Sequence, residues 1–209
     1  MRAALTLILL IGCVDNATEQ DVAETEQAST TAFANDQAAF NFFLQKGLTN
    51  FQAAGIVGNL DQESGVSPTS VQSGGPGRGI AQWSVGGRWD TSAGDNVHAY
   101  AAQQGESQTS LNLQLEFIWF ELQSFPGYGL ASLKATTNVT DATVAFMAKY
   151  EICGNCIQTQ RVNYAKAVLA AYDLTLSPAD VSQRPPTDHC AMPRPGPPDC
   201  TEVGLTPDS

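Results

Sequence analysis

A series of helical segments between residues 36 and 173, interrupted once by glycine, most constrains how this chain can fold. Thr49 and Gln52 form a capping-box pattern that opens a helix ending near Gly65. Glycines cluster between Ser73 and Gly87 too densely for a helix and predict a loop or a small hairpin. We therefore expect one mainly helical (α+β) domain with a small Gly-rich hairpin or sheet. Its other helices are expected from a cap at Asn35 to Gly47, at about 93–104, from Leu111 to Leu122, after a cap at Thr140, and at about 157–172.

The first residues are typical of an export signal. Met1 and Arg2 are followed by an apolar run that ends at Ile11 and is too short to span a bilayer. The sequence Leu10-Ile11-Gly12-Cys13 resembles a bacterial lipobox, in which the cysteine is lipidated after cleavage. Residues 1–12 are therefore expected to be a lipoprotein signal peptide, and Cys13 an anchor in the cell envelope. Val14 favours the outer membrane, and ordinary secretion is the alternative.

The two ends of the chain differ from its middle in their content of acidic residues and proline. The formal net charge is −11, which counts against a basic surface for nucleic acid or anionic lipid. Residues 39–173 carry ten acidic against seven basic side chains, so most of the excess lies outside the expected domain. We expect residues 13–35 to be an acidic flexible tether and residues 174–209, with eight of the eleven prolines, an irregular tail.

Four cysteines remain after Cys13. In an oxidising compartment an even number favours two disulfides, and pairing Cys153 with Cys156 and Cys190 with Cys200 is the most local of three possibilities. A zinc site is the alternative, but the spacing fits no common one, so we expect no metal and no cofactor. A cysteine peptidase or amidase is disfavoured, because its nucleophile would be bridged and only two histidines are present.

One carboxylate stands at a position suited to acid catalysis. Glu63 falls in the last turn of the helix that begins after Thr49. The C-terminal end of a helix carries partial negative charge and favours a carboxyl group that keeps its proton, as a glycosidase acid must. The alternative is a solvated glutamate with no role, since helix ends often expose one.

The surrounding residues carry a family resemblance. Gly58-Asn59, Glu63-Ser64 and Pro68 are followed by Gly79-Ile80-Ala81-Gln82-Trp83-Ser84 and Arg88, and later by Tyr150-Glu151, Arg161 and Ala165. Over about residues 35–172 this order resembles the phage tail lysozyme family of peptidoglycan glycosidases. The Cys153-Gly-Asn-Cys156 segment departs from the Pro-containing turn expected there.

The resemblance implies a lysozyme-like fold, in which the helix bearing Glu63 faces the small sheet across a sugar-binding cleft. Glu63 would be the general acid that cleaves the β-1,4 linkage between N-acetylmuramic acid and N-acetylglucosamine. Trp83 would stack on a sugar or, equally, belong to the core, and Arg88 would bind substrate or form a structural salt bridge. The substrate-binding candidates are Gln82, Trp83, Ser84 and Arg88.

The second catalytic group is left open by the sequence. Asp61 lies roughly 200° around the helix from Glu63 and should point elsewhere. Asp90, Asp95 and Glu151 are the candidates, although Glu151 is first expected to form a buried ion pair with Arg161. The same residues also resemble lytic transglycosylases, which need a single glutamate and leave 1,6-anhydro ends. A non-catalytic glycan-binding lipoprotein is the further alternative. With either function, the protein is expected to be a monomer.

Overall fold

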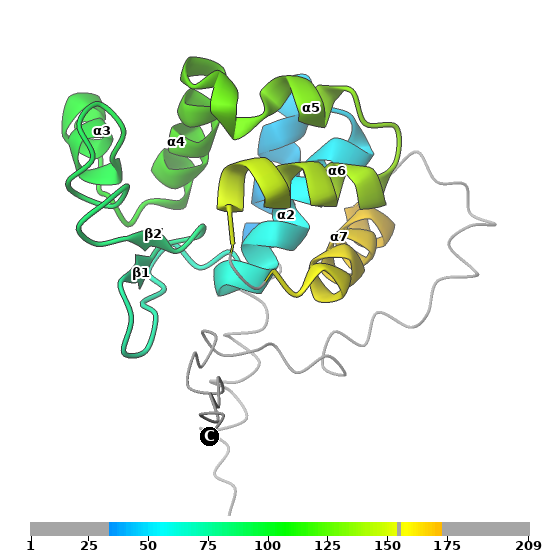
Figure 1. Cartoon of the computed structure of the whole chain (residues 1–209), viewed down its shortest axis with the longest axis horizontal. Helices are drawn as coiled ribbons and strands as arrows, with labels where there is room; N and C mark the ends of the chain where they lie inside the picture. Colours follow the sequence, from blue (N-terminus) through cyan, green and yellow to red (C-terminus); the bar gives the residue numbers. More distant parts are fainter. Residues whose placement is uncertain (1–33, 154–155, 173–209) are drawn as a thin grey trace, which may run out of the picture.

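The computed structural model describes residues 34–153 and 156–172, and Figure 1 shows them as a helical domain with a small hairpin on one side. The predicted mainly helical α+β fold is confirmed. A first helix covers residues 34–45. The elements after it are α2 (Asn50–Ser64), β1 (Gly77–Arg78), β2 (Trp83–Ser84), α3 (Val97–Gln104), α4 (Leu111–Ser124), η1 (Pro126–Tyr128), α5 (Leu130–Lys134), α6 (Val139–Phe146), the π-helical η2 (Met147–Glu151) and α7 (Gln158–Tyr172).

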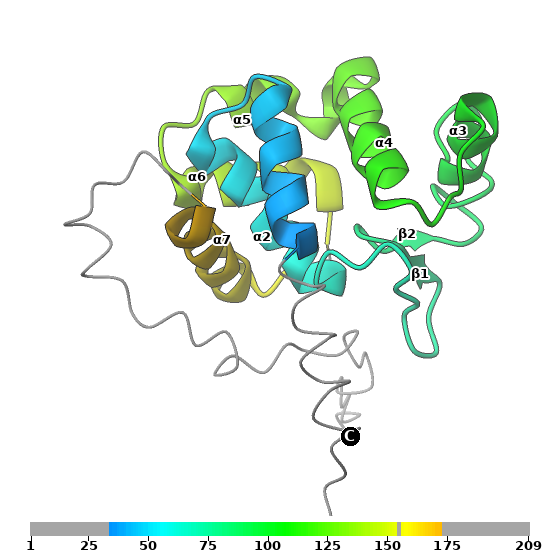
Figure 2. The ribbon, with the colours of Figure 1, turned by 180° about the vertical axis from the view of Figure 1, so that it is seen from behind.

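Helix α2 forms the centre of the domain. Its predicted capping box is present, because Thr49 Oγ1 accepts from Gln52 N and Gln52 Oε1 accepts from Thr49 N. Its glycines allow close approach of two other helices. A Cβ at Gly58 would lie 2.4 Å from the backbone nitrogen of Ala165 on α7, and one at Gly55 would lie 2.8 Å from that of Thr143 on α6. Helices α6 and α7 therefore lie directly against α2 (Figure 1, and Figure 2 from behind).

The Gly-rich segment forms the predicted hairpin. Strands β1 and β2 are antiparallel, with Gly77 opposite Ser84 and Arg78 opposite Trp83. Buried Gln114 on α4 holds the segment in place, because its Oε1 accepts from Ile80 N and its Nε2 donates to the carbonyl of Pro68. The hairpin, α3 and α4 lie on one side of α2 and α7 lies on the other, while α6 runs across α2 (Figures 1 and 2).

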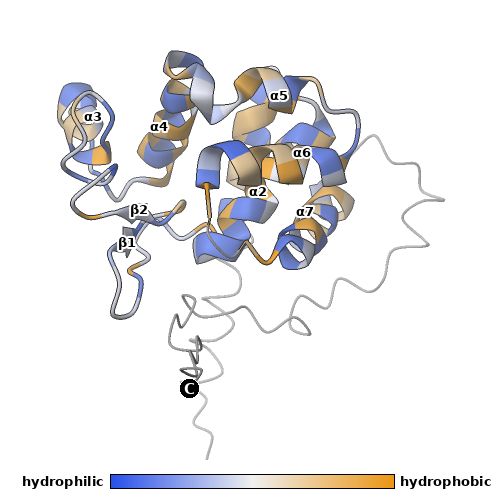
Figure 3. Ribbon diagram, viewed as in Figure 1, coloured by the Kyte–Doolittle hydropathy of each residue, from blue (hydrophilic) through white to orange (hydrophobic). Residues whose placement is uncertain are grey.

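The core runs from the first helix through α2 to α4 and α6. Figure 3 shows apolar residues along the inner faces of these helices. Burial of this apolar area stabilises the fold because it removes apolar surface from water, and α2 is buried over most of its length. The largest fully buried side chains are Tyr150, Phe40, Phe43, Phe117, Phe146, Ile56, Leu60, Ile80, Leu113, Ile118, Leu122 and Leu133.

Two predicted helix starts are wrong. Residue 34 is already helical, and Asn35 instead donates through Nδ2 to the carbonyl of Val66, 3.0 Å away. The cap of α6 is Asn138 rather than Thr140, because Asn138 has extended backbone and its side chain accepts from Asp141 N. Asparagine is a better N-cap than threonine, so the earlier residue ends up as the cap.

The expectations for the signal peptide, Cys13, the tether up to residue 33, the tail, Cys190 and Cys200 fall outside the described residues. No helix in the part that is described is long and apolar enough to cross a membrane.

Candidate active site

Glu63 lies in the last turn of α2, which is fixed on both sides. Gly65 ends the helix in the left-handed conformation, with φ of 62°. Ser64 Oγ lies 2.9 Å from the carbonyl oxygen of Ile80 and accepts from Ser67 N. The end of the helix is therefore fastened to the segment that leads into the hairpin, and the backbone of Glu63 has a defined position.

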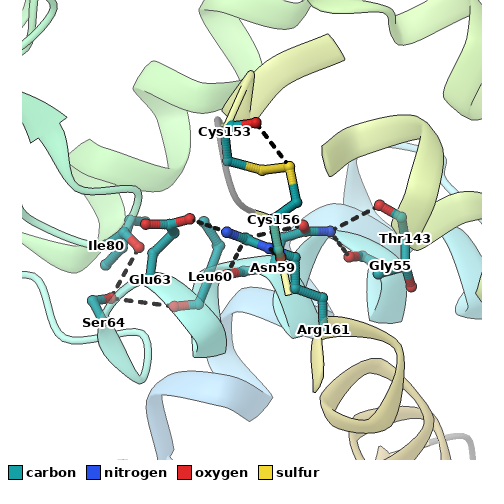
Figure 4. Close-up of polar contacts among 10 residues, drawn as sticks. All are labelled: Gly55, Asn59, Leu60, Glu63, Ser64, Ile80, Thr143, Cys153, Cys156 and Arg161. Carbon is teal, nitrogen blue, oxygen red and sulfur yellow. Dashed lines mark hydrogen bonds and ion pairs between the residues drawn. A yellow bond between two sulfur atoms is a disulfide. The ribbon is translucent and has the colours of Figure 1, made fainter. Parts of the chain in front are cut away.

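Arg161 on α7 binds the carboxylate of Glu63. Its Nη2 donates to Glu63 Oε1 at 2.5 Å, and the side chains are 4% and 15% exposed, respectively. Its Nε donates to the carbonyl of Cys156 at 2.8 Å, and its Nη1 contacts both oxygens of Asn59. Figure 4 shows the guanidinium between these three partners. A buried arginine with four acceptors is held rigidly and can orient the carboxylate that it touches.

Asn59 supports this arrangement one turn before Glu63. It is fully buried, its Nδ2 donates to the carbonyls of Gly55 and Thr143, and its Oδ1 accepts from Arg161. Sequence reasoning included Asn59 in the motif without assigning it a contact. The signal was its spacing, because residues four apart share one face of a helix.

Glu151, at the end of η2, is the candidate second carboxylate that lies within electrostatic reach of Glu63. Burial raises the pKa of Glu151 well above its usual value, the charge of Glu63 raises it further, and Arg161 and Arg88 oppose the shift. Its Oε1 is buried without a hydrogen-bond partner among the described residues. The pair therefore combines a carboxylate bound to arginine and a second carboxyl group whose pKa is raised.

The predicted ion pair between Glu151 and Arg161 is wrong. Arg161 forms its salt bridge with Glu63 instead. The reason lies in the close packing of α7 on α2 at Gly58, which brings Arg161 over the same face of α2 as Asn59 and Glu63.

The other two candidate carboxylates have structural partners. Asp90 Oδ1 accepts from Gly86 N and from Thr91 Oγ1, and the hydrogen bond from Thr91 is the main cause that lowers the pKa of Asp90. Asp95 Oδ2 accepts from the hydroxyl of Tyr128 at 2.7 Å. Asp90 therefore stabilises its own loop, and Asp95 links the segment before α3 to η1.

The hairpin residues differ in exposure. Trp83 is 2% exposed, stacks on Trp89 and meets the ring of Phe117 edge-on, so its indole belongs to the core. Of the two alternatives that the sequence left for Trp83, the structure shows packing in the core. Gln82 has φ of 47°, and its Nε2 already donates to the carbonyl of Gly79, while Ser84 is exposed. Ser84 is therefore the hairpin candidate whose side chain is open to a ligand.

Arg88 forms a structural salt bridge rather than a free substrate contact. Its Nε and Nη2 donate to the two oxygens of buried Glu121 at 2.7 and 2.8 Å, and its guanidinium lies 4.5 Å from the ring centres of Tyr128 and Tyr150. Burial raises the pKa of Glu121 to about 7 despite this pairing. Sequence reasoning missed Glu121, although an acid between apolar residues of a predicted helix indicates a buried charge that needs a partner.

No group of three or more His, Cys, Asp or Glu side chains suited to a metal ion occurs within residues 34–153 and 156–172. Cys153 and Cys156 are joined by a disulfide. The described site combines a glutamate oriented by a buried arginine with a second carboxyl group of raised pKa, and carboxyl groups of this kind are suited to general acid catalysis.

The helical bundle, the two-stranded hairpin and a glutamate at the end of the central helix together define a lysozyme-like fold. The chain belongs to the phage tail lysozyme family, whose model matches residues 34–172. It is thus a lysozyme-type hydrolase domain for peptidoglycan, a polymer that lies outside the cytoplasm. A search of curated proteins found no match.

Proposed function

We propose that this protein cleaves the β-1,4 linkage between N-acetylmuramic acid and N-acetylglucosamine, with Glu63 as the proton donor. The observation that supports this most is that Glu63, alone among the candidate carboxylates, combines partial exposure with a fixed position at the end of a buried helix and a bond to a buried arginine. Orientation of this kind lowers the entropy cost of reaching the transition state.

A proton donor has to carry a proton when the substrate is bound. We propose Glu151 as the source of this proton, because burial and the charge of Glu63 raise the pKa of Glu151. In the proposed reaction the proton held by the Glu63–Glu151 pair passes from Glu63 to the glycosidic oxygen as the C–O bond breaks.

The product depends on the nucleophile that follows. Water attacking the sugar carbon gives a reducing end, and the 6-hydroxyl of the muramic acid closing on that carbon gives a 1,6-anhydro end. In either case the pair takes up the proton released by the nucleophile. We propose hydrolysis. Analysis of the same products distinguishes it from the transglycosylase reaction, because only the latter leaves 1,6-anhydro ends.

The test digests purified peptidoglycan sacculi with the wild type and with Glu63→Gln, and identifies the fragments by mass spectrometry. We expect release by the wild type and a loss of at least about 100-fold in the variant, since general acid catalysis contributes about 10²–10⁴-fold. Glu106→Gln is the matched control, because Glu106 is an exposed glutamate remote from the site in sequence. Equal release by Glu63→Gln and the wild type would overturn the assignment. Binding of sacculi without cleavage would indicate a glycan-binding protein.

We also propose that Cys13 anchors the exported protein to the envelope through a lipid. The support is the resemblance of Leu10-Ile11-Gly12-Cys13 to a lipobox. A Cys13→Ser protein should be released from the membrane fraction of the native host, and continued membrane association would contradict the anchor.

A further inference from the structure

Cys153 and Cys156 form a bridge between η2 and α7, and the residues on either side of this bridge have an unfavourable backbone conformation. Ile152 has φ of 50° and Ile157 has φ of 42°, although branched side chains rarely adopt the left-handed region. Both side chains are more than half exposed, at 69% and 51%. Burial of these side chains therefore does not explain why the conformation persists.

The bridge lies one hydrogen bond away from the arginine that holds Glu63. The carbonyl of Cys156 accepts from Arg161 Nε at 2.8 Å, and Arg161 Nη2 donates to Glu63. Figure 4 shows this continuous path from the disulfide through the guanidinium to the carboxylate. The position of the Cys156 carbonyl thus helps to set the position of the guanidinium.

We propose that the Cys153–Cys156 bridge is a redox-sensitive device that positions Arg161, and through it Glu63, for the reaction. This inference rests on the proposed function of Glu63. Reduction by a dithiol breaks the S–S bond, adds two electrons and two protons to give two thiols, and leaves the dithiol as a disulfide. Arg161 acts here as a positioning residue, since it touches the acid and not the bond that breaks.

Release of the bridge removes one restraint on Ile152 and Ile157, and at Ile152 the hydrogen bond from its N–H to the carbonyl of Met147 is a second. The backbone next to the bridge can then rotate toward negative φ more readily, and the Cys156 carbonyl moves with it. Arg161 keeps its contacts with Asn59 but loses the acceptor of its Nε. The carboxylate of Glu63 is then less well oriented, while α2, α6 and α7 remain packed on one another through Gly55 and Gly58.

The test compares sacculus digestion before and after treatment with dithiothreitol in three proteins. We expect about a tenfold fall in the wild type, because small displacements of a catalytic group cost rate steeply. Cys190→Ser/Cys200→Ser is the matched control and should show the same fall. Cys153→Ser/Cys156→Ser should be slow from the start and should not respond to the dithiol. An unchanged rate in the reduced wild type would overturn the proposal.

Two further readouts separate this inference from the function on which it rests. The Arg161 Nε–H proton, followed by NMR, should exchange slowly with solvent in the oxidised protein and rapidly after reduction. This change supports the positioning role even if Glu63→Gln shows that the catalytic assignment is wrong, and its absence counts against the role. Far-UV circular dichroism should stay constant, and loss of the helical signal on reduction would also overturn the proposal, because the bridge would then hold the fold.

Discussion

Arg161 Nη2 lies 2.5 Å from Glu63 Oε1 and joins two helices whose contacting residues are 98 positions apart in the sequence. The bond connects the end of α2 to the first turns of α7, and a buried asparagine on α2 completes the contact. The candidate acid is therefore oriented by a residue from the last helix. Substitutions on α7 should change the chemistry of a group on α2.

Substitution of Arg161 should separate its orienting effect from its charge. Arg161→Lys keeps the charge but cannot reproduce the fork of hydrogen bonds, and we expect a fall in kcat of about 10-fold with KM nearly unchanged. Arg161→Met removes the hydrogen bonds together with the charge, so kcat should fall further than in Arg161→Lys. Equal kcat values in the wild type and in Arg161→Met would show that Arg161 does not orient the acid.

Gly58→Ala should destabilise the protein although alanine is the better helix former. The added Cβ would lie 2.4 Å from the backbone nitrogen of Ala165, so α7 has to move. We expect a loss of about 2–3 kcal/mol in the free energy of unfolding, measured by urea denaturation. Gly127→Ala is the control, because a Cβ there meets nothing within 4 Å. A stabilised Gly58→Ala protein would show that the two helices are not in close contact.

Stability should fall as the pH rises from about 5 to 8. Burial raises the pKa of Glu121 in the folded protein to about 7 from an ordinary value of 4.5, so the folded state binds more protons than the unfolded state between these values. The contribution of Glu121 to the free energy of unfolding is therefore greatest below about pH 4.5. It is lost as the pH rises through the folded pKa, and the loss is about 3 kcal/mol. The raised pKa of Glu151 acts in the same direction.

Glu121→Gln tests this assignment through the pH dependence itself. Glutamine is neutral at every pH, so the difference in unfolding free energy between pH 5 and pH 8 should shrink in the variant. Glu106→Gln, which changes an exposed carboxylate, should keep the wild-type difference. A wild-type protein that is more stable at pH 8 than at pH 5 in urea unfolding would contradict the argument.

Ile152→Gly should stabilise the protein by about 1 kcal/mol. The substitution removes the cost of a branched residue at φ of 50° and gives up little buried area, since the side chain is mostly exposed. Val85→Gly is the matched control, because Val85 is also an exposed branched residue but does not have positive φ. Val85→Gly should lower the melting temperature, because glycine increases the conformational entropy of the unfolded chain. A lower melting temperature for Ile152→Gly would show that the left-handed residue is not strained.

The sequence was sufficient for the features that depend on local interactions. Three such features were predicted from residues within a few positions of one another: the capping box at Thr49, the end of α2 near Gly65 and the hairpin between Ser73 and Gly87. The order of motif residues around Glu63 likewise indicated the family, which the family model confirmed. Helix starts were less certain, because Asn138 and Thr140 are both able to cap α6.

Only the tertiary structure decided which partner each charged residue has. From the sequence, Arg88 was able to bind either substrate or a carboxylate, and Arg161 was expected to pair with Glu151. In the structure Arg88 forms its salt bridge with Glu121, and Arg161 forms its salt bridge with Glu63. A long side chain reaches any of several groups, and local sequence does not specify their distances. The close contact of α7 with α2 at Gly58 fixes those distances, so the environment of Glu63 depends on residues about a hundred positions away.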